Sequence, residues 1–78
     1  MSNANLVNVV NRWEAEEDGW EFRIDESLDG YFNVYYNSNG YWVNNHLWFP
    51  TYQSARSFMK KEYDLSTRMK KVSLVSSN

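Results

Sequence analysis

The segment from Gly30 to Ala55 constrains the fold of this chain most strongly, because it contains no charged residue. Nine aromatic side chains lie within its 26 residues. A chain of 78 residues forms only a small core, since small domains bury a smaller share of their surface than large ones. Some of these rings must therefore stay at the surface. An aromatic surface without charge is typical of a contact surface rather than a reaction centre.

The length predicts a single small domain over residues 1–78, in which residues 1–4 are a tag or a flexible start. The absence of cysteine leaves disulfides and thiolate metal sites out of the fold. No apolar run reaches the ~20 residues of a membrane span, and no segment resembles a signal peptide. We therefore expect a cytoplasmic protein, located in the host cytoplasm if a phage encodes it.

Apolar and charged residues alternate from Trp20 onward, which predicts a half-buried antiparallel strand. The Asp-Gly pair ending at Gly30 then marks a hairpin. A three-residue loop with Gly30 in the left-handed region pairs Ile24 with Val34 and keeps both on the buried face. This register is the one we predict.

A second hairpin is predicted at the Asn-Gly pair that ends at Gly40. A two-residue loop there pairs Tyr36 with Val43. Continued along the strand, the same register pairs Phe32 with Leu47.

The N-terminal segment allows two interpretations. Leu6, Val9, Val10 and Trp13 follow helical spacing, which favours a helix. The many β-branched residues instead favour a strand with Val7, Val9 and Trp13 on one face. We predict the helix.

Pro50 is expected to end the sheet, and Thr51 to cap a second helix. Residues 66–78 then form a basic tail or a short extra strand. The predicted fold class is α+β: a three-stranded antiparallel sheet with helices on one face, in the order α-β-β-β-α. The apolar face of the second helix comprises Tyr52, Ala55, Phe58, Met59 and Tyr63.

The sheet face opposite the helices is the predicted partner-binding surface. Flat rings interleaved with amides make apolar contacts and hydrogen bonds at low entropic cost. We predict a non-enzymatic protein–protein interaction module, of the kind that phages encode as inhibitors of host proteins. The alternatives are a homodimer seam, cover by the C-terminal segment, or binding of sugar rings. The predicted contact residues are Tyr31, Asn33, Tyr35, Trp42, Asn44, His46 and Trp48.

Catalysis finds little support in the sequence, and we predict neither an enzyme nor a bound cofactor or metal. The chain contains one histidine and no cysteine, and it lacks nucleophile-elbow, P-loop and dinucleotide-binding patterns. The acidic run between Glu14 and Glu21 lacks calcium-loop spacing, which favours a solvated turn.

The charge distribution is uneven and supports the runner-up function, nucleic-acid binding. Residues 1–50 carry two basic and eight acidic side chains, whereas residues 51–78 carry six basic and two acidic ones. A basic segment with nearby aromatic rings can bind phosphates and stack on bases. The net charge of −2 disfavours a dedicated nucleic-acid binder. The candidate contacts are Arg56, Lys60, Lys61, Arg68, Lys70 and Lys71.

Overall fold

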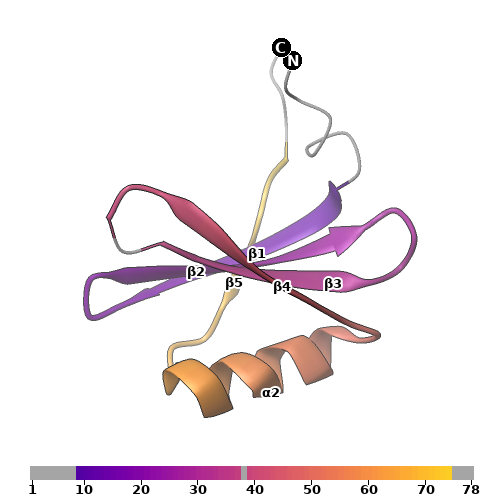
Figure 1. Ribbon diagram of the computed structural model, residues 1–78. Helices are drawn as coiled ribbons and strands as arrows, with labels where there is room; N and C mark the ends of the chain where they lie inside the picture. The colour runs from indigo at the N-terminus through magenta and orange to yellow at the C-terminus, as the bar shows by residue number, and fades with distance from the viewer. Residues whose placement is uncertain (1–8, 38, 75–78) are drawn as a thin grey trace.

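The computed structural model describes residues 9–37 and 39–74. In this part of the chain five strands form one antiparallel sheet, in the order β4-β3-β2-β1-β5, and one helix packs against a single face of it (Figure 1). The predicted fold class is therefore wrong in its strand number and its element order. The elements are β1 (Val9–Glu17), β2 (Trp20–Ser27), β3 (Phe32–Asn37), β4 (Trp42–Phe49), α2 (Tyr52–Tyr63) and β5 (Lys70–Val72).

The segment predicted as the first helix is strand β1, which pairs with β2. The turn between these strands explains the error. Asp18 and Gly19 both have positive φ, 55° and 83°, as a two-residue type I′ turn requires. This turn pairs Glu17 with Trp20 and aligns the preceding residues along β2. Pairing with β2 stabilises the strand more than the apolar spacing of a few residues stabilises a helix.

Side chains of β1 alternate between the two faces of the sheet, as a strand requires. Trp13 lies opposite Ile24 and packs against the core, whereas Arg12 and Glu14 point to the other face. Leu6 and Val7, which entered the sequence prediction, lie outside the described residues.

The predicted register between β2 and β3 is confirmed. Ile24 pairs with Val34, and both side chains are fully buried. Gly30 has a φ of 93°, and the Ser27 N–H donates to the Tyr31 carbonyl oxygen over 2.8 Å, which closes the three-residue loop. Glycine suits this position because other residues are strained at positive φ.

The predicted register between β3 and β4 holds only at the start of β4. Tyr36 pairs with Val43 as expected. Phe32, however, pairs with Phe49 instead of Leu47. The pairing has therefore shifted by two residues along β4.

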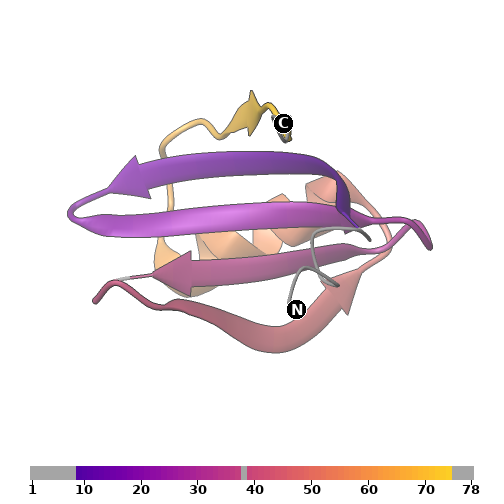
Figure 2. The ribbon, with the colours of Figure 1, turned by 90° about the horizontal axis from the view of Figure 1, so that it is seen from above.

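A bulge in the middle of β4 causes this shift. Tyr35 pairs with Asn44, but Asn33 pairs with Trp48. Between these two pairs β4 therefore contains two more residues than β3. His46 lies inside the bulge with a φ of 63°. Figure 2 shows β4 bowing away from β3 along its middle. Bulges of this kind re-aim side chains and interrupt an edge strand that would otherwise be regular.

The second helix forms as predicted, and Thr51 caps it. The Thr51 hydroxyl accepts a hydrogen bond from the Ser54 N–H over 3.0 Å, and the Ser54 hydroxyl reaches back to the Thr51 N–H. The apolar face of α2 packs on the sheet through Ala55 and Met59, both fully buried. The buried core comprises Phe22, Ile24, Phe32, Val34, Ala55, Met59, Leu65 and Met69.

The chain after α2 returns to the far edge of the sheet. There β5 pairs antiparallel with β1, with Val72 opposite Arg12 and Lys70 opposite Glu14. In the described residues this segment widens the sheet and does not cover the sheet face opposite α2, as Figure 2 also shows.

Candidate contact surface

The sheet face opposite α2, called here the open face, carries most of the predicted contact residues. Val34 points to the core, so its neighbours Asn33 and Tyr35 point to the open face. Their partners in β4 are Trp48 and Asn44, which lie on the same face. Trp42 joins them as the partner of Asn37.

The centre of the open face is an ion-paired strip that the sequence analysis did not predict. Arg12 forms a bidentate salt bridge with Asp25, with Nε–Oδ1 and Nη2–Oδ2 distances of 2.7 and 3.0 Å. The two side chains are only 14% and 5% exposed. The hydrogen bond to Asp25 raises the pKa of Arg12, so the guanidinium stays charged.

A second pair lies beside the first. Arg23 donates to Glu14, with an Nη2–Oε2 distance of 2.9 Å, and its guanidinium stacks 3.9 Å from the centre of the Trp42 ring. This cation–π contact holds Trp42 in place and covers part of its face. Trp42 is therefore half-buried, and its ring is less accessible than an exposed anchor requires.

Tyr35 lies in a shallow hollow next to this strip. The hollow has a volume of about 410 Å³, and its lining includes Arg12, Arg23, Trp42 and Asn44. Burial, followed by the charge of Asp25, raises the pKa of the Tyr35 phenol. The phenol therefore stays protonated at neutral pH and can donate a hydrogen bond.

The most exposed rings of the predicted set lie at one corner of the sheet. Trp48 is 60% exposed and Tyr31 41% exposed. Their ring centroids are 4.6 Å apart at an interplanar angle of 64°, an edge-to-face contact that fixes both rings. Ser27 donates to the Asn33 side-chain oxygen over 3.0 Å just beside them.

Two further polar residues, Asn44 and His46, precede Trp48 in β4. The His46 N–H donates to the Asn44 side-chain oxygen over 2.7 Å. His46 itself is exposed. We call the group formed by Tyr31, Asn33, Asn44, His46 and Trp48 the Trp48 corner.

The six basic candidates for nucleic-acid contact do not form one surface. Arg56 donates to the carbonyl oxygens of Leu65 and Thr67, over 3.1 and 2.8 Å, and so supports the loop after α2. Lys70 and Lys71 are neighbours in β5 and point to opposite faces of the sheet. The others, Lys60, Lys61 and Arg68, are exposed on α2 or in the following loop.

The acidic run is used mainly for internal contacts. Glu14 pairs with Arg23, and Glu21 accepts from the Asn37 side chain over 3.0 Å. Glu17 accepts from Ser66 and Thr67 and fastens the loop after α2. Within residues 9–37 and 39–74 no cluster of histidine and carboxylate side chains is arranged to hold a metal ion.

Comparison with protein-family models, curated proteins and solved structures found no match to this chain. None of the helical residues in the described ranges forms a segment long and apolar enough to cross a membrane. The interpretation of function therefore depends on the geometry of the surface.

One signal in the sequence could have revealed the ion-paired strip. If Asp18 and Gly19 are read as a two-residue hairpin loop, every residue of the preceding segment receives a partner in β2. Arg12 then faces Asp25, and Glu14 faces a residue of opposite charge. These complementary pairs favour the strand over the helix.

Proposed function

We propose that this chain is a small protein-binding module and that it contacts its partner through the Trp48 corner. The observation that carries the proposal is the exposure of Trp48, at 60%, in a fold whose other tryptophans are more covered. Tryptophan is enriched among the residues that dominate binding energy at protein interfaces. Exposing such a ring to water is unfavourable, and a partner's pocket would remove that cost.

The order of the Trp48 corner supports this proposal. Trp48 is held edge-to-face by Tyr31, so little side-chain entropy is lost when a partner binds. Asn33 is the cross-strand partner of Trp48, and Asn44 and His46 precede Trp48 in β4, so polar side chains with hydrogen-bonding groups lie on the strands that carry this contact. An aromatic centre with a polar rim is the usual anatomy of an interface.

The charges of the sheet support a partner recognised by shape and apolar contact. Arg12 and Arg23, the basic side chains of the central strip, are each paired with a carboxylate of this chain. Strand β4 itself carries no acidic or basic side chain other than His46. We therefore propose a folded protein with an apolar pocket as the partner, in the cytoplasm. Inhibition of a host protein by a phage product stays a prediction from the sequence.

Affinity capture tests this proposal. The wild-type chain, Trp48→Ala and Tyr41→Ala are immobilised and exposed to nuclease-treated cell lysate at low and moderate salt. Tyr41 is a matched control because it is 77% exposed and lies outside the Trp48 corner. We expect the wild type and Tyr41→Ala to retain the same protein, and Trp48→Ala to lose it. Truncating such an anchor costs about 2–4 kcal/mol of binding, roughly thirtyfold or more in affinity.

Two outcomes would contradict the proposal. Equal retention by Trp48→Ala and the wild type would remove the Trp48 corner from the interface. Retention of nucleic acid in untreated lysate, lost steeply as salt rises and abolished by Lys60→Glu with Lys61→Glu, would instead support the nucleic-acid alternative. Circular dichroism of each variant would confirm that the fold is intact.

A further inference from the structure

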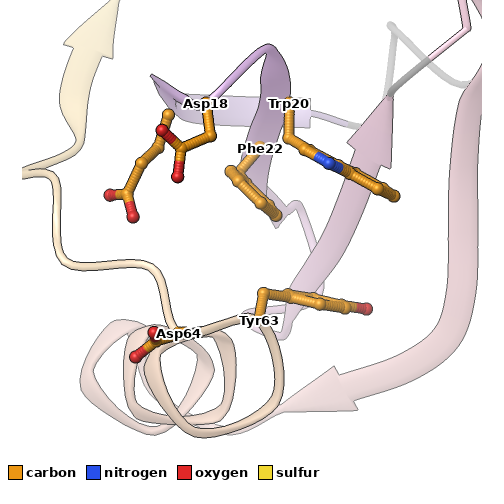
Figure 3. A pocket seen from close by; sticks show the side chains of 6 residues that line it. Asp18, Trp20, Phe22, Tyr63 and Asp64 are labelled. Atoms are coloured by element: carbon orange, nitrogen blue, oxygen red, sulfur yellow. The ribbon is translucent and has the colours of Figure 1, made fainter.

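A second cavity lies away from the Trp48 corner, between the β1–β2 turn and the C-terminal end of α2 (Figure 3). Its volume is about 310 Å³. This is near the lower end of the roughly 300–1,000 Å³ typical of small-molecule sites. The residues that line it are Glu17, Asp18, Trp20, Phe22, Tyr63 and Asp64.

Three aromatic rings form one side of the cavity. Phe22 is buried, and its ring lies 5.5 Å from that of Tyr63 and 6.5 Å from that of Trp20, measured between centroids. Trp20 is 42% exposed, so part of its indole remains accessible. Figure 3 shows Trp20 and Tyr63 extending from opposite sides of the opening, with Phe22 between them. The negative faces of such rings attract a cation within about 6 Å.

Carboxylates form the other side. Asp18 occupies the type I′ turn with a φ of 55°, and Asp64 caps α2 with a φ of 57°, so backbone geometry places both. Figure 3 shows both carboxylates on the side of the cavity away from the Trp20 ring. Glu17 is the third. The hydroxyl of Thr67, and then its N–H, lower the pKa of Glu17, which keeps this carboxylate ionised.

The helix adds to the same electrostatic field. The cavity lies at the C-terminal end of α2, where unpaired carbonyl groups give a helix its partial negative charge. Lys60 and Lys61 belong to the last turn of α2, but neither lines the cavity. The lining therefore holds three acidic side chains and no basic one.

We propose that this cavity binds an organic ammonium group, the alkylated head group that choline and trimethylated lysine share. Aromatic faces combined with carboxylates suit a cation that carries apolar methyl groups, because the methyl groups contact the rings while the positive charge faces the carboxylates. A bare metal ion fits poorly, since the three carboxylates of the lining, like the other described acidic and histidine side chains, are not arranged to hold one. The site is independent of the Trp48 corner.

An NMR titration with choline tests the proposal. The matched control ligand is 3,3-dimethylbutan-1-ol, which has the same shape without the charge. We expect saturable shifts at the Trp20 indole N–H and at the Asp18 and Asp64 amides with choline, and none with the neutral alcohol. A trimethyl-lysine peptide is titrated in parallel with choline to identify the source of the head group. A tenfold higher affinity for the peptide than for choline indicates a protein ligand. Equal affinities indicate a free metabolite.

Two double variants separate charge from fold. Asp18→Asn with Asp64→Asn removes two charges and keeps residues that tolerate positive φ. We expect choline to bind about tenfold more weakly to this variant, equivalent to about 1.4 kcal/mol. Glu26→Gln with Asp29→Asn removes two charges near the β2–β3 turn and should leave the affinity unchanged.

The proposal is overturned if choline and the neutral alcohol shift the same amides to the same extent, or if no shift saturates. The proposal is also overturned if both double variants lower the affinity for choline equally, because the effect would then come from the net charge of the protein and not from the cavity. The titration uses purified protein without a partner, so its failure would leave the Trp48 corner untouched.

Discussion

Asp25→Ala is expected to destabilise the fold by about 3 kcal/mol, because it removes one partner of the central ion pair of the open face and leaves the other buried. The Asp25 side chain is 5% exposed and accepts two hydrogen bonds from Arg12. Removing it leaves a guanidinium that is only 14% exposed without its carboxylate. Breaking a buried pair in this way costs roughly 3–5 kcal/mol, and the residual exposure of Arg12 places the cost at the low end. A domain of this length has about 4–12 kcal/mol of stability, so the variant should still fold.

Two further variants test the physical reason. Replacing both partners, Arg12→Met with Asp25→Leu, should recover most of the loss, because no charge is then left unpaired. Glu14→Ala breaks the neighbouring pair, in which the Glu14 side chain is 36% exposed. That change should cost less than about 1 kcal/mol, since exposed pairs contribute little.

Urea unfolding followed by tryptophan fluorescence measures all four proteins, and the midpoint and slope give the free energy of unfolding. The reasoning is refuted if Asp25→Ala costs no more than Glu14→Ala. It is also refuted if the double replacement is as unstable as Asp25→Ala. Either result would mean that the strip is solvated and that burial of the pair contributes nothing.

Three other predictions concern the framework. Thr51→Ala should lower stability by about 1 kcal/mol through loss of the helix cap, while Gln53→Ala on the exposed side of α2 should change it little, both measured by urea unfolding. Met59→Ala should cost about 2–5 kcal/mol because the side chain is fully buried; a loss below 1 kcal/mol would contradict its place in the core. Glu17→Gln should lower the melting temperature at about pH 7, whereas Glu16→Gln should not. The pKa of Glu17 is lowered from its ordinary 4.5, so its contribution is present above that pH and lost as pH falls through the folded value; a difference that persists in acid would contradict this.

Sequence patterns predicted the middle of this fold well, because local turn chemistry fixes it. The three-residue loop at Gly30 sets the register between β2 and β3, and one slipped residue would have moved Ile24 to the open face. The same reasoning placed Asn33 and Tyr35 on the open face. These pairings depend on residues near each other in the chain.

The features that the sequence analysis missed have three separate causes. Strand β1 was predicted as a helix because its apolar spacing was read without the hairpin at Asp18. The bulge at His46 has no glycine to mark it in the sequence, and positive φ is uncommon for any single non-glycine residue. It shifted the pairing of Phe32 from Leu47 to Phe49. The cavity beside α2 was missed as well, because it forms only where the β1–β2 turn meets the helix end.

Photo-cross-linking beside Trp48 tests the central claim most directly. A benzoylphenylalanine replaces Tyr31, whose ring contacts that of Trp48, in one protein and Gln53, on the outer side of α2, in a second. Both are irradiated in the same cell extract. The proposed contact surface predicts one cross-linked protein species from position 31 and none from position 53. Identical cross-links from the two positions, or none from position 31, would contradict it.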